Sequence, residues 1–266
     1  MAAPETETQA PRSDDWDQHW TSYAEAAAQN PAQTYRRKLV FGLLDLAGAQ
    51  GQVRVLELGS GQGDFSRDLA VAFPQAEIAG LELSATGVEI AARKVANGRF
   101  FQCDMTRPVT PPPGLAGWAT HAVCSEVLEH VDDPTAMLRN VRPLFAPGCR
   151  LVITVPGGPM SAFDRHIGHR RHFTTELLGR LIADAGLTPE VVRGEGYPFF
   201  NLYRLFVVAR GKALIADVDQ SGGRPLPLAA RVAMRSFDRL FRLNPPATMR
   251  GWQLVARALE PTPPAP

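Results

Sequence analysis

Short apolar runs alternate with amphipathic stretches along most of this chain. The apolar runs have the length of buried strands and cover residues 53–58, 76–83, 99–105, 119–125 and 149–156. The amphipathic stretches have the pattern of helices that bury one face and cover residues 63–73, 84–97, 134–145 and 174–186. Strands that alternate with helices at this spacing predict βαβ units and a mostly parallel sheet.

The rest of the pattern completes an α/β fold of the Rossmann-like type. Residues 191–192 belong to a sixth strand and 251–259 form a seventh, so we expect a seven-stranded sheet with helices on both faces. Residues 14–50 predict an N-terminal helical cap, broken at Asn30–Pro31. Residues 197–246 predict a helical lid inserted before the last strand, over the carboxyl edge of the sheet where such folds bind ligands.

The ends of the chain and its composition set limits. The Rossmann-like core comprises 51–196 and 247–260, and the polar, proline-containing ends at 1–13 and 261–266 are expected to be disordered tails. The sequence has neither a signal-peptide pattern nor an apolar run long enough to span a bilayer, which predicts a cytoplasmic protein. A net charge of +1 gives no global field that would recruit nucleic acid. The cysteines form no CxxC pair and are expected to be small buried hydrophobes.

A glycine-rich segment follows the first strand, where the chain must turn sharply into a helix. Gly59, Gly61 and Gly63 let the backbone bend there and approach a ligand closely. A dinucleotide site would place its third glycine at position 64, but that residue is Asp64. Acidic groups at Glu57 and Asp64 disfavour a pyrophosphate and suit a ligand that carries an ammonium and a sulfonium group.

The ends of the next two strands carry matching chemistry. Glu82 ends the second strand, where an acidic residue reaches ribose hydroxyls. Asp104 ends the third strand and is placed to bind an adenine amino group, with Met105 as apolar packing.

Five segments together resemble the class I S-adenosylmethionine-dependent methyltransferases. They are ELGSGQG (57–63), LELS (81–84), CDM (103–105), SEVLEHVDDP (125–134) and PGCRLVITVP (147–156). The resemblance covers residues 53–195 and is closest to the small-molecule branch with the ubiquinone-biosynthesis methyltransferases. It implies S-adenosylmethionine as cofactor, bound by Glu57, Gly59, Ser60, Gly61, Gly63, Phe65, Glu82, Leu83, Asp104, Met105 and Ser125.

The N-terminal segment has unusually many aromatic residues for a solvated helix: Trp16, Trp20, Tyr23 and Tyr35, besides His19. In the resembled family, such aromatics and an arginine close over the methionine end of the cofactor. Tyr23 is therefore a candidate for cofactor binding and catalysis, and Arg36 or Arg37 for pairing with the cofactor carboxylate. The alternative is that this helix only packs on the sheet.

A turn rich in carboxylates follows the fourth strand. If it is helical, Glu126, Glu129 and His130 lie on one face at i, i+3 and i+4. One interpretation makes His130 or Glu126 the general base. Another makes all three ligands of a Mg²⁺-like ion, with His166 or His169 completing the set; two relatives of the fold show this Glu-x-x-Glu-His pattern. In the third, the turn only braces the loop.

Histidines and arginines gather between residues 164 and 173, after the fifth strand. Arginine forks match phosphate or carboxylate oxygens, so the density of positive charge predicts an anionic small-molecule substrate. The candidate substrate-binding residues are His166, His169, Arg170, Arg171 and His172, with Tyr197 and Tyr203 from the lid. The alternative is that the cluster ties this loop to the next helix.

A methyltransferase for a small, anionic molecule agrees best with these features. A basic loop against an apolar lid suits a phosphate head with a hydrocarbon tail, so a prenyl diphosphate such as isopentenyl diphosphate, methylated at carbon, is the sharpest hypothesis. An O-methyltransferase of a phenolic or quinone precursor is the alternative. Asp64 and the early third glycine argue against a nicotinamide-dependent oxidoreductase. The intact 125–130 turn argues against a non-catalytic module.

Overall fold

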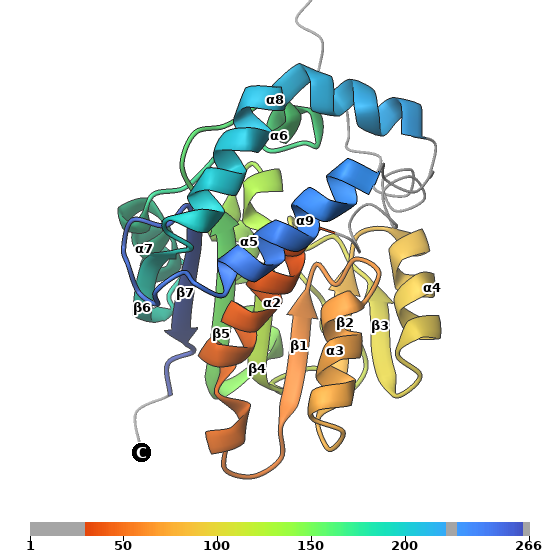
Figure 1. The fold of residues 1–266 in the computed structure, drawn as a ribbon. Helices are drawn as coiled ribbons and strands as arrows, with labels where there is room; N and C mark the ends of the chain where they lie inside the picture. The colour runs from red at the N-terminus through yellow and green to blue at the C-terminus, as the bar shows by residue number, and fades with distance from the viewer. Residues whose placement is uncertain (1–29, 222–227, 263–266) are drawn as a thin grey trace, which may run out of the picture.

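The computed structural model describes residues 30–221 and 228–262 and contains a seven-stranded sheet. The strand order is β3-β2-β1-β4-β5-β7-β6, and β7 runs antiparallel to both of its neighbours (Figure 1). The strands are β1 (Arg54–Leu58), β2 (Glu77–Glu82), β3 (Gly98–Gln102), β4 (Ala119–Ser125), β5 (Phe145–Pro156), β6 (Thr188–Glu195) and β7 (Gln253–Leu259). The predicted Rossmann-like α/β fold is confirmed.

Helices cover both faces of the sheet, so the central strands are buried on both sides and read as continuous apolar runs. On one face, Val55 of β1 packs with residues of α2 (Pro31–Leu44) and α3 (Asp64–Ala72). On the other face, Leu56 packs in a second core with residues of α5 (Pro134–Val141) and α7 (Thr175–Asp184). The remaining helix of the core, α4 (Ala85–Lys94), follows β2 and precedes β3.

The first described helix begins where the sequence indicated a break. Asn30 caps α2, because its side chain accepts a hydrogen bond from the Ala32 N–H, and Pro31 occupies the first helical position. The other residues singled out in the N-terminal segment, Trp16, His19, Trp20 and Tyr23, lie outside the described residues.

Several element boundaries differ from expectation by a few residues, and two of the differences bear on the argument. The helix predicted for 134–145 ends at Val141, and Arg142–Leu144 form a 3₁₀ turn before β5 begins at Phe145. Pro143 explains this difference, because proline has no N–H to continue an α-helix and clashes with the preceding turn. The third strand ends at Gln102, so Asp104 and Met105 lie in the loop beyond it.

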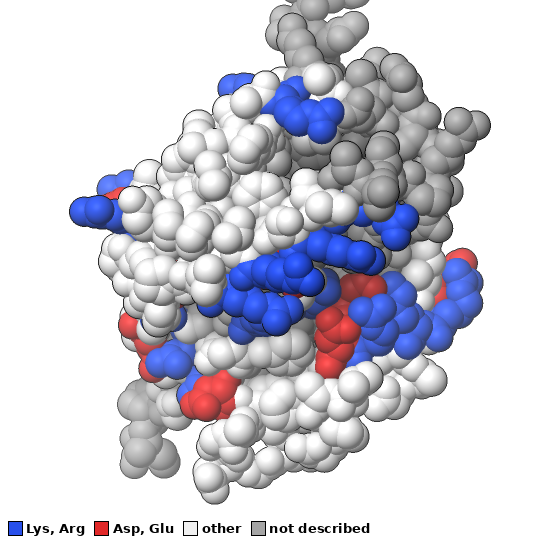
Figure 2. Space-filling view, viewed as in Figure 1, with Lys and Arg blue, Asp and Glu red and all other residues white. Residues whose placement is uncertain are grey.

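Two helices of the insertion lie over the carboxyl ends of the strands (Figure 1). They are α8 (Phe199–Ser221), which is kinked at Gly211, and α9 (Leu228–Phe241). Their contact with α2 is aromatic: Phe200, Tyr203 and Phe241 form a small core against which Tyr35 packs. Figure 2 shows lysine and arginine side chains gathered in a band below the white surface of these helices, beside a patch of acidic residues. No helix among the described residues has the length and apolar character of a bilayer span.

Candidate active site

A cavity of about 690 Å³ opens at the carboxyl edge of the sheet, beneath the lid. One half is lined by the loop after β1 and by the ends of β2 and β3, including Gly59, Gly61, Glu82 and Asp104. The other half is lined by the turn after β4, the loop after β5 and the lid, including Glu126, His130, His169 and Arg204. Most of the residues that the sequence assigned to the cofactor therefore line one continuous cavity with Glu126, His130, His169 and Arg170.

The glycine-rich loop has the backbone conformation that the sequence predicted. Gly59, Gly61 and Gly63 have φ of 73°, 51° and 74°, in the left-handed region that favours glycine. A Cβ atom on Gly59 would lie 2.5 Å from Cγ2 of Val127, and one on Gly63 would lie 2.9 Å from Cβ of Ala91. These glycines therefore permit the turn and the close packing around it.

Glu82 shapes this loop from the neighbouring strand. Its carboxylate accepts hydrogen bonds from the Gly61 N–H at 2.8 Å and the Ser84 N–H at 3.0 Å, and it is buried at the cavity wall. Asp104 accepts from the N–H and hydroxyl of Thr106, at 3.0 and 2.6 Å. Both acids line the cavity at the strand ends, as expected for contacts to ribose and adenine, and those roles stay predictions.

Burial makes Glu57 an unusual acid. It raises the pKa of this carboxyl to about 8, although the Ser66 hydroxyl donates to it at 2.5 Å and lowers the pKa. A buried acid with a raised pKa next to a ligand cavity responds strongly to a nearby positive charge. The other predicted residues of this half, Ser60, Phe65, Leu83, Met105 and Ser125, also line the cavity.

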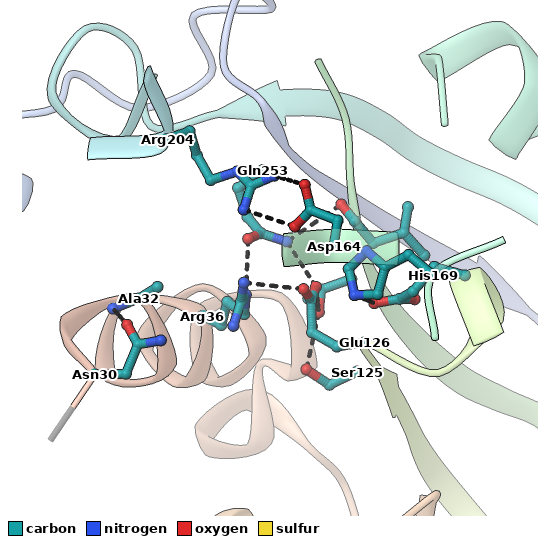
Figure 3. Close-up of polar contacts among 12 residues, drawn as sticks. Asn30, Ala32, Arg36, Ser125, Glu126, Asp164, His169, Arg204 and Gln253 are labelled. Atoms are coloured by element: carbon teal, nitrogen blue, oxygen red, sulfur yellow. Dashed lines mark hydrogen bonds and ion pairs between the residues drawn. The ribbon is translucent and has the colours of Figure 1, made fainter. Parts of the chain in front are cut away.

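Four side chains from distant parts of the chain form a clamp where the two halves meet (Figure 3). Arg36 of α2 donates through Nε to Oε1 of Gln253 at 2.8 Å, and its Nη2 lies 3.0 Å from Oε2 of Glu126. Oε1 of Glu126 accepts from Nε2 of Gln253 at 2.9 Å and from the Thr154 hydroxyl at 3.0 Å. Gln253 is fully buried and opens β7. Sequence reasoning missed it; the available signal was a single amide at the start of an apolar strand.

The expected single helical face of the carboxylate–histidine turn is wrong. Glu126 has φ of 57° and stands outside the 3₁₀ turn Leu128–His130, so its side chain points to Arg36 and Gln253. Glu129 and His130 are instead joined by His169, and the donor atoms of these three lie within 4.8 Å of one another. Arg37, the other candidate for the cofactor carboxylate, pairs with Asp68 at 2.8 Å.

Glu129 is the least solvated acid of the site. It is 0% exposed, and neither carboxylate oxygen has a hydrogen-bond partner among the described residues; Nε2 of His169 lies 4.0 Å from Oε1. Burial first, and then the charge of Glu126, raise the pKa of this carboxyl well above its usual range. A buried carboxyl in this state either holds a proton or faces a bound cation.

The neighbouring histidines have fixed proton positions. His172 Nδ1 lies 3.0 Å from the carbonyl oxygen of Gly158, which can only accept, so this nitrogen carries the proton. Nε2 of the neutral His172 must then accept, and His169 Nδ1 donates to it across 3.3 Å. Burial lowers the pKa of His172, and it lowers that of His169 to about 3, so both rings are neutral at pH 7. The lone pair of His169 Nε2 therefore faces Glu129.

Two arginines of the basic loop after β5, and Arg204 of the lid, already have partners within the protein, which the prediction of free positive charge did not take into account. Arg170 forms an ion pair with the Asp132 carboxylate, and Arg171 donates to the Asp132 carbonyl oxygen at 2.6 Å. Asp164 of α6 (Ala162–His166) receives both Nη atoms of Arg204, at 3.1 and 2.8 Å. The reason is long-range: Asp132 lies 39 residues before Arg171, and Arg204 lies 40 residues after Asp164.

The remaining predicted substrate residues divide in the same way. His169 and Arg170 line the cavity, whereas Arg171, His166, His172, Tyr197 and Tyr203 do not. Tyr203 packs between aromatic rings of the lid, and its hydroxyl donates to the Asn30 side chain at 3.2 Å. Arg204, which the sequence did not single out, reaches the cavity from α8.

The strand order, the glycine loop and the acidic residues at three successive strand ends define a class I, S-adenosylmethionine-dependent methyltransferase. A family model described as a methyltransferase domain matches residues 28–192, more than half of the chain, and the chain belongs to that family.

Known proteins agree with this assignment. A ubiquinone biosynthesis O-methyltransferase of Xanthomonas oryzae pv. oryzae (strain PXO99A) is 32% identical over 140 residues, covering 51% of this chain and 54% of that protein. The chain spans about half the length of the curated relatives it matches. These relatives place it in the small-molecule branch.

Solved structures share the fold over nearly the whole chain. The [4+2]-cyclase SpnF has a TM-score of 0.62 at 20% identity, covering 96% of this chain and 98% of that one. Geranyl diphosphate C-methyltransferase from Streptomyces coelicolor A3(2) has a TM-score of 0.53 at 15% identity, covering 95% and 85%. At these identities the similarity shows the fold alone.

Proposed function

We propose that the protein transfers a methyl group from S-adenosylmethionine to a hydroxyl oxygen of a small organic molecule, such as a phenol. The observation that carries this proposal is the continuous cavity, which leads from the glycine loop to His130 and His169. A hydroxyl nucleophile must lose a proton when its oxygen attacks, and the imidazole of His130 at the cavity wall is suited to receive it. The O-methyltransferase relative supports the same choice.

The charges of the cavity favour a hydroxyl acceptor over a diphosphate. Each of its four arginines already has a carboxylate partner: Arg36 with Glu126, Arg37 with Asp68, Arg170 with Asp132 and Arg204 with Asp164. A diphosphate would have to displace those carboxylates. A cavity with this many acids suits the positive cofactor, and prenyl diphosphate methylation becomes the less favoured hypothesis.

The protein's own contribution is alignment and proton removal. The acceptor oxygen attacks the methyl carbon in line with the carbon–sulfur bond, and the bonding pair of that bond leaves with sulfur as S-adenosylhomocysteine. The hydroxyl proton passes to His130. Glu126 is held by its three donors and positions the turn rather than accepting the proton.

A metal ion at the same histidines is the second candidate. The buried, unpartnered carboxylate of Glu129 and the lone pair of His169 Nε2 fit a cation, with His130 as third donor. Two imidazoles and one carboxylate suit a transition metal ion better than Mg²⁺. Such an ion would lower the pKa of an acceptor hydroxyl bound to it.

Methyl transfer from labelled S-adenosylmethionine to a panel of phenols, catechols and prenyl diphosphates tests the proposal. His130→Gln should lower turnover by about 10²-fold or more with unchanged S-adenosylhomocysteine binding, whereas His166→Gln, an exposed position off the cavity, should not. Labelling of prenyl diphosphates alone would overturn the hydroxyl assignment. Loss of activity in chelator, restored by Mn²⁺ or Zn²⁺, would select the metal; full activity in chelator would select the proton route.

A further inference from the structure

The lid carries most of the large apolar side chains that the described residues expose. Seven of the ten exposed large hydrophobics lie between Tyr197 and Met249. Three of them, Leu202, Leu205 and Phe206, are 42%, 49% and 54% exposed. At spacings of three and four residues they share one side of α8, and we name them the apolar ridge.

The apolar ridge lies on the outside of a helical hairpin. Phe200 packs on Phe241, whereas Tyr203 and Phe206 pack on Phe237, so α8 and α9 run antiparallel. The inward side of α8 is used by Tyr203 and by Arg204, which reaches the cavity. On α9, Val232 adds another exposed apolar side chain, at 53%. Nothing in the described part of the chain covers this outer surface.

Exposed positive charge lies on the other helix of the hairpin. Arg231, Arg235 and Arg239 are exposed and spaced four residues apart, so they form a stripe along α9. None of the three has an acidic partner within 4.0 Å among the described residues, and the one acid of α9, Asp238, pairs with Arg242. In Figure 2, a band of basic side chains runs below the white surface of the lid helices.

We propose that the lid hairpin docks on the surface of a bilayer that contains anionic lipid. An exposed apolar face bordered by arginines is the pattern of helices that lie in the interface, with apolar side chains at the acyl boundary and cations at the headgroups. A second copy of this chain is a poorer occupant, because a two-fold interface would bring the two arginine stripes towards each other. Docking would place the lid, and the cavity beneath it, next to amphiphilic acceptors.

Flotation with vesicles tests this surface directly. The full-length protein should float with vesicles of phosphatidylcholine containing about 30% phosphatidylglycerol, and much less with phosphatidylcholine alone or at high salt. Replacing Arg235 and Arg239 together by Glu should weaken partitioning about 25-fold or more, since each arginine near such a surface contributes about five-fold. The matched control replaces Arg93 and Arg180, exposed on α4 and α7, by Glu and should float like wild type.

A second pair of variants tests the contribution of the apolar ridge to docking. Leu202→Ser with Leu205→Ser should also abolish flotation, whereas Val71→Ser with Leu177→Ser, exposed on other helices, should not. Unchanged melting temperature and S-adenosylhomocysteine binding in each variant separate docking from folding and from the proposed function, on which this inference does not rest. Absence of flotation by wild type, or equal loss in the control variants, would overturn the proposal. So would a wild-type dimer that the ridge variant splits into monomers, because the ridge would then belong to a second copy.

Discussion

The clamp around Gln253 gives the sharpest quantitative test of the site. Gln253→Leu keeps the size of the side chain but removes the amide that donates to Glu126 and accepts from Arg36. Hydrogen bonds to charged groups contribute about 1.5–3 kcal/mol each. Two such bonds are lost, together with the bond from Gln253 Nε2 to the Val155 carbonyl oxygen, which contributes about 1 kcal/mol. Burial of the leucine offsets about 1–2 kcal/mol, so the net loss of stability is about 2–6 kcal/mol. For a domain of this size that lowers the melting temperature by roughly 5–25 °C.

The binding readout separates a local effect from a global one. Arg36 and Glu126 line the cavity. The affinity for S-adenosylhomocysteine should therefore decrease in the variant, even when calorimetry is done at a temperature well below its melting temperature. Gln52→Leu, which replaces an exposed glutamine, is the control and should change neither quantity. A Gln253→Leu protein that melts within about 2 °C of wild type and binds S-adenosylhomocysteine equally well would refute the clamp.

The isosteric change Gln253→Glu adds a pH test. It sets a second carboxylate at hydrogen-bond distance from Oε1 of Glu126, and two carboxylates this close cannot both ionise. The raised pKa of the pair means that its stability is present at low pH and is lost as pH rises through that pKa. The deficit of this variant relative to wild type should therefore shrink as the pH is lowered.

Three further predictions concern the rest of the cavity. Gly61→Val should weaken S-adenosylhomocysteine binding at least about ten-fold in calorimetry, because φ of 51° strains a β-branched residue and misplaces the N–H that Glu82 accepts. For Glu57, whose pKa is raised from 4.5 to about 8, stability relative to Glu57→Gln is present below the lower value and is lost as pH rises through the higher one. Urea unfolding at about pH 6 and about pH 9 checks the sign, and a pH-independent difference would contradict it. Arg171→Ala should lower the melting temperature and leave the Michaelis constant of the acceptor unchanged, because the Arg171 side chain bonds the Asp132 carbonyl oxygen and does not itself line the cavity; a raised Michaelis constant would restore it as a substrate ligand.

Local sequence patterns predicted the backbone of the glycine-rich turn and the acidic residues at the strand ends, for a physical reason. The turn after β1, with Gly59 and Gly61, depends on backbone conformations that the residue type dictates. The position of Glu82 at the cavity could be predicted from its place at a strand end, because the carboxyl ends of parallel strands lie at the same edge of the sheet. The sheet itself followed from apolar runs buried on both faces.

The acceptor half was harder to predict because its side chains are set by partners far away in the sequence. Arg36 and Gln253 are 217 residues apart, and Glu126 turns towards both of them instead of joining Glu129. Arg171 was predicted to bind substrate, but in the structure it donates to the carbonyl oxygen of Asp132, 39 residues earlier in the chain. The role of His169 depends on a chain of ring contacts that ends at the Gly158 carbonyl oxygen, which no spacing rule encodes.

The antiparallel last strand determines how the helical insertion is connected to the sheet. Because β7 runs against β6, Glu195 and Gln253 are register partners, and the whole helical insertion leaves and re-enters the sheet at one point. In topological terms, 196–252 is the loop of a β-hairpin, which a short turn could close. Such an insertion can be lengthened, shortened or replaced while the strands keep their order. Gln253, the first residue after this insertion, is the point at which any replacement must still contact Arg36 and Glu126.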